Sequence, residues 1–438
     1  MAALALALAA CSSDNPGPQE GTLGFVPGFI GGAVSDEPRA ALAARDVLSA
    51  GGTAADAAAA LYFTLAVTKP AQAGLGGGGV CVVYNWRSKQ VETLNFLPPI
   101  QPGQGVIPGN TRGMLALQAK YGRLRWELIV NTGERLARLG TTTSRSTARD
   151  LAVAAPMIAD DAGLKAVFMG SDGAVPTEGT VLSQPELGAT LSMIRRSPQD
   201  FYTGPFARNF ADAATEAGQR IDPEAMRNYA PTWETPASTP FGFYTMYFPA
   251  SAAGTTAANA WRTLGTEGGY RKASDQPAAL LAAVPGQPPG GPSAETSFAV
   301  ADRDGSMVAC TVTMNYFFGA GRMARGTGIV PAAPDPAGRV GGLTPMLAVN
   351  PAVPRPYFAG AASGGVAGTR GLLASALGVF DLGQPLDVAM ASPRPDQTGL
   401  VNGIYCPRGI NPLGSNETPE AICQLTADRR GFGLAQHD

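Results

Sequence analysis

The alternation of apolar and polar residues predicts a β-hairpin late in the chain. Residues 296–302 and 307–313 are rich in Val, Thr and other strand-forming residues. Between them, residues 303–305 read Arg-Asp-Gly, a turn sequence whose glycine accepts a positive φ. Pairing about this turn places Glu295 opposite Thr313 with Cβ atoms about 5 Å apart, which is close enough for a side-chain hydrogen bond.

Apolar residues also recur at helical spacing along much of the chain. Residues 38–51 end at a glycine pair typical of a helix C-terminus, and the alanine-rich residues 56–67 predict a buried helix. A glycine run at 74–79 follows this helix and opens a strand, the reverse of a dinucleotide-binding loop, so a nucleotide site is excluded. We also expect helices over 112–140, 146–160, 205–218, 223–228, 366–382 and 385–392, and strands over 80–95, 240–250, 296–315 and 345–360.

Composition narrows the possible functions. A chain of 438 residues that is 45% hydrophobic can bury a large core, and its net charge of −2 without a basic patch gives no support to nucleic-acid binding. No run reaches the roughly 18 apolar residues of a membrane span. The single histidine, His437, excludes an internal Ser-His-Asp triad and a histidine-based metal cluster. We expect no cofactor and no metal.

The first residues resemble the processing site of a bacterial lipoprotein. Residues 2–10 form a short apolar run ending in Leu-Ala-Ala, followed by Cys11, which would become the lipidated first residue, and by a polar tether. A basic segment before the apolar run is absent. We expect an anchored, periplasm-facing envelope protein; a plain secretion signal or an alanine-rich terminus is the alternative. Of the other cysteines, Cys406 and Cys423 are candidates for a disulfide, whereas Cys81 and Cys310 are expected to be buried thiols.

The segment before the hairpin is typical of a processing site. Residues 285–292, rich in Pro and Gly, predict an exposed linker, and a strand starting after such a linker is where a precursor is cut to free a new N-terminus. That chemistry needs a hydroxyl or thiol on the first residue after the cut, and the freed α-amine then serves as base. Asn315, two residues beyond Thr313, is expected on the face of Thr313.

These residues resemble the nucleophile-bearing motif of the γ-glutamyltranspeptidase family of N-terminal-nucleophile hydrolases. That motif is roughly T-T-H-[FY]-S-V-x-D-x-x-G, followed by T-x-T-x-N. Residues 295–302 read ETSFAVAD, Gly305 follows, and residues 311–315 read TVTMN. In this register Glu295 stands at the nucleophilic threonine, Thr313 at the threonine that hydrogen-bonds the nucleophile, and Asn315 at a substrate-contacting asparagine.

The resemblance extends over most of the chain. Gly364 and Gly365 resemble the glycine pair that stabilises the oxyanion in this family. The family's fold would be an α/β four-layer αββα sandwich. Residues 1–22 would be the signal and tether, residues 23–290 resemble the large subunit, and residues 291–438 resemble the small, nucleophile-bearing subunit. The two subunit-like regions would form one intertwined domain. The other matching segments are 31–38, 51–58, 74–80, 106–109, 120–122, 201–204 and 360–365.

The chain departs from the family at several positions of one pocket. Leu97 stands where the family has an arginine that grips the substrate's α-carboxylate, and leucine cannot replace that contact. The family's paired serines become Gly341 and Gly342. The family's acidic residue that receives the substrate's α-ammonium would align at or near Ala337. Asp335 is the nearby acid, and aligning it with that residue requires a small gap in the alignment.

Two functions follow from the resemblance. An active enzyme would hydrolyse or transfer γ-glutamyl groups of glutathione-like amides, using Thr296 after autocleavage. Because strand side chains alternate faces, Thr296 would face Thr313 only if the strand shifted by one residue. We favour instead an unprocessed, catalytically impaired protein that binds a γ-glutamyl-type small molecule or an envelope partner through the same cleft. Glu295 would then be an acid or base paired with Thr313, or simply a solvated or hydroxyl-paired residue at a strand end.

Overall fold

The computed structural model describes residues 31–437 except 101–102, 289, 336–341 and 411–422. The expectations for Cys11, the tether, Ala337 and Gly341 lie outside the described residues. Within them, the strands form a seven-stranded sheet, a six-stranded sheet and a two-stranded sheet, in which the described strands pair antiparallel.

The seven-stranded sheet has the order β15-β1-β9-β10-β2-β3-β6. Its central strands are those of the predicted hairpin, which is confirmed, with its turn at 303–306. In chain order the strands of this sheet are β1 (Gly31–Ser35), β2 (Gly78–Asn85), β3 (Gln90–Asn95), β6 (Thr232–Glu234), β9 (Glu295–Asp302), β10 (Met307–Thr313) and β15 (Leu434–His437).

The six-stranded sheet has the order β14-β13-β12-β11-β8-β7 and packs face to face on the first. The layer between the sheets is rich in small and β-branched residues such as Ala299, Ala309, Val349 and Ala361, which suits two close-packed sheets. The strands are β7 (Ala237–Phe241), β8 (Tyr244–Phe248), β11 (Met346–Asn350), β12 (Arg355–Ser363), β13 (Leu400–Tyr405) and β14 (Gln424–Ala427), while β4 (Thr141–Thr142) pairs with β5 (Val181–Leu182).

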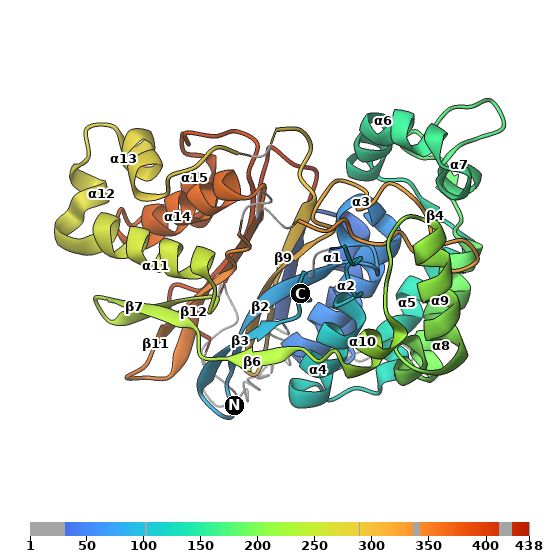
Figure 1. The fold of residues 1–438 in the computed structure, drawn as a ribbon. Helices are drawn as coiled ribbons and strands as arrows, with labels where there is room; N and C mark the ends of the chain where they lie inside the picture. Colours follow the sequence, from blue (N-terminus) through green and yellow to red (C-terminus); the bar gives the residue numbers. More distant parts are fainter. Residues whose placement is uncertain (1–30, 101–102, 289, 336–341, 411–422, 438) are drawn as a thin grey trace, which may run out of the picture.

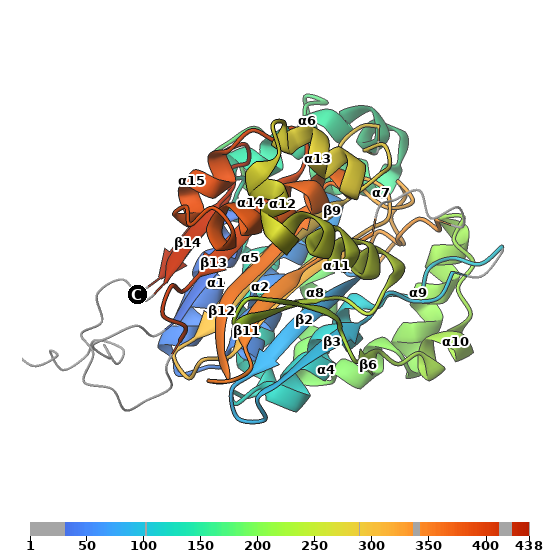
Figure 2. The same ribbon diagram turned by 90° about the vertical axis from the view of Figure 1, so that its left-hand side faces the viewer.

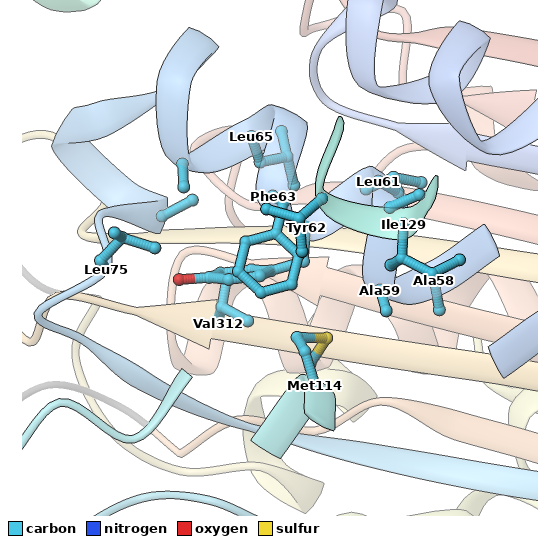
Figure 3. Close-up of a cluster of buried hydrophobic side chains, with 14 of the residues drawn as sticks. Ala58, Ala59, Leu61, Tyr62, Phe63, Leu65, Leu75, Met114, Ile129 and Val312 are labelled. Atoms are coloured by element: carbon cyan, nitrogen blue, oxygen red, sulfur yellow. The ribbon is translucent and has the colours of Figure 1, made fainter. Parts of the chain in front are cut away.

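Helices cover the outer face of the seven-stranded sheet (Figure 1). The central one, α2 (Ala54–Thr68), begins at a capping box in which the Thr53 side chain accepts from Asp56 N–H and Asp56 accepts from Thr53 N–H. All 15 residues of α2 are buried, as the alanine-rich sequence predicted. Figure 3 shows Leu61, Tyr62 and Phe63 of this helix packed among Met114, Ile129 and Val312.

The other helices on this side of the seven-stranded sheet lie within residues 38–228. The helical pattern over 112–140 is interrupted at Gly122, whose N–H bonds to Gln118 O at the end of one helix before a second begins. The helices are α1 (Pro38–Ser49), α3 (Pro70–Ala73), α4 (Asn110–Tyr121), α5 (Trp126–Leu139), α6 (Arg145–Asp160), α7 (Ala162–Phe168), α8 (Pro185–Arg196), α9 (Gly204–Glu216) and α10 (Pro223–Asn228), with a 3-10 turn at Pro198–Phe201.

A second helical layer covers the outer face of the six-stranded sheet and completes the predicted α/β four-layer αββα sandwich. Figure 2 shows α11–α14 lying in front of that sheet. The apolar side chains of this layer form their own core with the strands beneath, including Trp261, Phe358 and Leu377. The helices are α11 (Ala252–Gly265), α12 (Gly269–Lys272), α13 (Gln276–Ala283), α14 (Val366–Phe380) and α15 (Leu386–Ala391), with a 3-10 turn at Thr266–Gly268.

The expectation that Cys81 and Cys310 are free thiols was wrong. They are directly opposed on β2 and β10, with Cα atoms 4.1 Å apart, and their sulfurs form a disulfide. A Cα separation near 4.5 Å is typical of the closer, non-hydrogen-bonded pairs of an antiparallel ladder, so neighbouring strands bring these side chains together. Cys406 and Cys423, the candidate pair from the sequence, form the second disulfide.

Candidate functional site

Glu295 is the first residue of β9, at the end of the linker. The described residues of 285–292 have no helix or strand and are mostly exposed, as predicted. The strand register pairs Glu295 with Thr313, again as predicted, and buries Glu295 to 4% exposure. Exposure falls from the linker through the half-buried Ser293, so both residues of the Ala294–Glu295 peptide are buried.

The Glu295 carboxylate is bound by two backbone N–H groups. Gly364 N–H and Gly365 N–H each donate to Glu295 Oε2 at 2.9 Å. The two glycines have φ of 101° and 58°, a left-handed backbone that favours glycine and turns both N–H groups toward the same oxygen. Helix α14 begins at the next residue, and the partial positive charge of its N-terminus adds to the attraction for an anion.

Burial nevertheless opposes the charged form of this carboxylate. The pKa of Glu295 is raised to about 7, mainly because the group is removed from water, although the hydrogen bonds from Gly365 and Gly364 act in the opposite direction. Its second oxygen, Oε1, is buried and has no hydrogen-bond partner among the described residues. Near neutral pH, the Glu295 side chain therefore exchanges between its protonated and its ionised form.

The expected hydrogen bond between Glu295 and the Thr313 hydroxyl does not form. Thr313 Oγ1 donates instead to Ala294 O at 3.2 Å, and Met314 N–H donates to the same carbonyl at 3.1 Å. Thr313 Oγ1 also accepts from Asn315 N–H at 2.9 Å. The Glu295 side chain reaches the glycine pair, which leaves Thr313 to hold the carbonyl that precedes Glu295.

Thr296 lies on the other face of β9. Its hydroxyl is fully buried and donates to Asp36 Oδ2 at 2.9 Å. Asp36 also accepts from Ser297 N–H and from the Asn402 side chain. Burial raises the pKa of Asp36. The nearby positive charge of Lys69 and these hydrogen bonds lower this pKa and so offset part of the rise. The alternation of strand side chains thus turns Thr296 away from Thr313, as the sequence predicted.

Leu97, Asp335 and Gly342 line one pocket of about 200 Å³. Asn315 and Thr313 lie in its wall, and the Asn315 side chain donates to Ala333 O at 2.7 Å from a left-handed backbone with φ of 65°. We call it the Leu97 pocket; its described lining is Gly78, Leu97, Pro98, Ile100, Val106, Thr313, Asn315, Ala332, Asp335, Gly342 and Leu343.

A second pocket of about 360 Å³, the Lys69 pocket, is lined by Glu295 and by more charged side chains than the Leu97 pocket. Lys69 Nζ forms a buried ion pair with Asp150 Oδ2 at 2.6 Å. Its described lining also includes Asp36, Gln72, Arg149, Ser293, Ser363 and Arg430. The paired residues Glu295 and Thr313 thus border different pockets. The sequence did not single out Lys69 or Asp36, although Asp36 lies in the matching segment 31–38.

Two further features bear on function. No group of three His, Cys, Asp or Glu side chains within the described ranges is arranged to hold a metal ion. Over the same residues, no helix combines the length and apolar character that crossing a bilayer requires.

Solved structures share this architecture. A cephalosporin acylase from Bacillus halodurans superposes with a TM-score of 0.76 at 19% identity, covering 98% of this chain and 99% of that protein. The γ-glutamyltranspeptidase of Helicobacter pylori superposes with a TM-score of 0.53 at 24% identity, covering 59% of this chain and 82% of that one. At these identities the likeness shows the fold alone.

Sequence relatives and a family model identify the lineage. Glutathione hydrolase 2 of Arabidopsis thaliana is 28% identical over 229 residues, and the glutathione hydrolase proenzyme of Bacillus subtilis is 27% identical over 234 residues. Each match covers 48% of this chain and only 39% or 40% of the relative. The gamma-glutamyltranspeptidase family model matches residues 40–98 and 97–283, which is more than half of the chain. The chain therefore belongs to the gamma-glutamyltranspeptidase family.

Proposed function

We propose that this protein is an unprocessed, catalytically impaired member of its family that binds a ligand or partner through the retained cleft. The observation that carries this proposal is the position of the Glu295 carboxylate. It stands at the family's nucleophile position and accepts both N–H groups of Gly364 and Gly365 at 2.9 Å.

The same two N–H groups are those that family chemistry requires. Acyl transfer builds negative charge on a carbonyl oxygen, and preorganised N–H donors that stabilise this charge are a major source of catalysis. Here a permanent side chain occupies them. A carboxylic acid in place of a hydroxyl also removes the nucleophile, both for cutting the Ala294–Glu295 peptide and for attacking a γ-glutamyl amide.

The alternative, an active amidohydrolase or transferase that uses Thr296, has less support. Thr296 Oγ1 is fully buried and donates to Asp36 on the face of β9 opposite to Thr313. Bringing it to the glycine pair needs a one-residue shift of β9, which would turn every side chain of that strand to the other face.

We further propose a periplasm-facing envelope location through a lipid on Cys11. Both disulfides support an oxidising compartment, because structural disulfides are rare in reducing cytosol. The ligand would be a γ-glutamyl-type small molecule or an envelope partner.

The test is self-cleavage of the purified chain, produced from residue 12 onward. Denaturing gels and intact mass should show one uncut chain. A Glu295→Thr variant restores a hydroxyl and frees the glycine N–H groups, so we expect it to cut itself before residue 295. Glu295→Ala, which frees the same N–H groups without supplying a hydroxyl, is the matched control and should stay whole.

Two fragments from the unmodified chain, the second beginning at Thr296, would overturn the proposal and support the transferase. A Glu295→Thr chain that stays whole would show that the hairpin lacks more than the nucleophile. If Glu295→Thr does cut itself, the cleavage rate of a Glu295→Thr, Thr313→Ala double variant measures how much Thr313 contributes by holding the Ala294 carbonyl.

A further inference from the structure

We propose that the Lys69 pocket binds a small molecule through a primary ammonium group, which donates to Glu295 and Gln72. This inference deepens the proposed ligand-binding function, on which it rests, by naming the chemical class of the ligand. The amine is held as its cation and does not react, because a protonated nitrogen has no lone pair with which to attack an acyl group.

Glu295 lines the pocket with half of its hydrogen-bonding capacity unused. Oε2 accepts the N–H groups of Gly364 and Gly365 at 2.9 Å, whereas Oε1 is buried and has no partner among the described residues. A buried acceptor without a donor costs free energy, which a new hydrogen bond recovers. A ligand N–H that reaches Oε1 therefore completes the bonding of this carboxylate.

Gln72, on α3, provides a second open acceptor in the same lining. Its side chain is 5% exposed, and its Oε1 is likewise buried without a partner within the described ranges. The terminal torsions of Gln and Glu side chains are broad, so a small rotation turns either oxygen toward the cavity. An ammonium group carries three N–H donors and no acceptor, which suits two acceptors that border one pocket.

Glu295 is also a buried carboxylate without a positive partner. Lys69 Nζ is paired with Asp150 Oδ2 at 2.6 Å, and the charge of Lys69 also lowers the pKa of Asp36. Among the described residues, no cation contributes in this way to the pKa of Glu295. Charges attract more strongly inside a protein than in water, so an ammonium group beside Glu295 supplies the missing charge.

The two arginines of the lining do not supply it. Arg430, from the segment before β15, donates to Asp428 Oδ1, to Gln397 Oε1 and to a backbone carbonyl. Arg149, on α6, has a side chain that is 47% exposed, so water and salt screen its charge. The other charged groups that line the pocket beside Glu295 are Asp36 after β1, Lys69 between α2 and α3, and Asp150 on α6.

The rest of the lining suits a short organic body. Val153, Pro292 and Leu400 bring apolar groups to the pocket. Small-molecule sites typically combine such walls with a few polar groups that fix orientation. At roughly 30 Å³ for a group the size of a water molecule, the pocket volume of about 360 Å³ holds about twelve non-hydrogen atoms. n-Butylamine is well within this size.

The experiment titrates three probes into the protein produced from residue 12 onward, followed by ligand-observed saturation-transfer NMR at constant ionic strength. The probes are n-butylamine, butyltrimethylammonium, which keeps the charge without N–H donors, and 1-butanol, which lacks the charge. We expect n-butylamine to bind roughly fivefold more tightly than either, because it alone combines a positive charge with several N–H donors.

The affinity for n-butylamine should also depend on pH. An alkylammonium has a pKa of about 10 and stays charged up to pH 8, whereas Glu295, with a pKa of about 7, must ionise to bind it. The affinity should therefore rise by roughly tenfold from pH 6 to pH 8, following the ionised fraction of Glu295.

Three variants assign the binding to this pocket. Glu295→Gln should abolish the pH dependence and weaken n-butylamine at pH 8, whereas Gln72→Met should weaken it and keep the pH dependence. Glu127→Gln removes an exposed acid on α5 and should leave both affinity and pH dependence unchanged. Circular dichroism confirms that each variant is folded.

Other results would overturn the inference. They are equal binding of n-butylamine and butyltrimethylammonium, an affinity that does not change with pH, and n-butylamine binding that Glu295→Gln leaves intact. Absence of binding by n-butylamine would contradict it too, while an uncut chain on the gel would still support the proposed function. A chain that cuts itself yet binds n-butylamine with this dependence on Glu295 would overturn the proposed function alone.

Discussion

At the scale of single residues, the side chain at position 295 decides what occupies the two glycine N–H groups. The Glu295 side chain is long enough to reach the two N–H groups of Gly364 and Gly365. A shorter hydroxyl at the same position would leave those donors open. In the proposed function, the residue that replaces the nucleophile thus also fills the anion site that the reaction would use.

The raised pKa of Glu295 predicts a pH-dependent stability. The folded protein releases this proton at about pH 7, whereas the ordinary value is 4.5, so the folded state holds more protons between these values. The contribution of Glu295 to the free energy of unfolding is therefore fully present at low pH and falls as pH rises through about 7, by about 3 kcal/mol in total.

A Glu295→Gln variant cannot ionise and should lack this loss. We expect the difference in unfolding free energy, variant minus unmodified protein, to rise by about 3 kcal/mol between pH 4 and pH 8, measured by urea denaturation. Asp302, whose pKa burial raises to about 6, titrates in both proteins and cancels in the difference. A difference that stays constant with pH would contradict a raised Glu295 pKa.

At the scale of elements, the hairpin was predictable from sequence and several other elements were not. β9 and β10 follow from local alternation and an Arg-Asp-Gly turn, because pairing across a tight turn involves neighbours in the chain. Helix α11 was missed: its sequence contains Gly254, Thr255 and Thr256, which weaken helix propensity, and packing of Trp261 into the second core compensates.

The disulfide between β2 and β10 predicts a specific loss of stability when it is removed. Cys81 and Cys310 are separated by 229 residues and Cys406 and Cys423 by 17. The chain-entropy model gives upper values of about 5 and about 3 kcal/mol for loops of these lengths. Replacing both members of the first pair by Ala should therefore lower the urea midpoint more than the same change in the second pair.

The state of the cysteines provides the control for this comparison. Intact mass after alkylation without reductant should show no modified thiol in the folded, oxidised protein. Rapid alkylation of Cys81 or Cys310 under these conditions would mean that the pair is reduced in solution, and the stability comparison would then measure cavities instead of a cross-link.

At the scale of the whole molecule, strands from the two parts of the chain alternate within one sheet. β9 and β10, which follow the linker, lie between β1 and β2, which precede it, and β15 pairs with β1 at the edge. Neither part completes the sheet by itself, since removal of the hairpin would expose the edges of β1 and β2 and the apolar faces beside them.

This arrangement predicts how the protein responds to a designed break. Residues 12–294 and 295–438, expressed separately, should be unfolded or insoluble, whereas coexpressed fragments should copurify as one particle of native-like circular dichroism. A break within β10, between residues 309 and 310, is the contrasting case and should prevent assembly. Cooperative unfolding of isolated 12–294 would show that it is an independent domain.

The sequence by itself determined the family, the register of Glu295 against Thr313 and the orientation of Thr296. These depend on motif spacing and on the two-residue period of a strand, which act over a few residues. Only the tertiary structure decided that the Glu295 carboxylate lies on the Gly364 and Gly365 N–H groups and that Cys81 bonds to Cys310. Such contacts join segments about 70 and 229 residues apart, and packing of sheets and helices, which no local pattern encodes, brings them together.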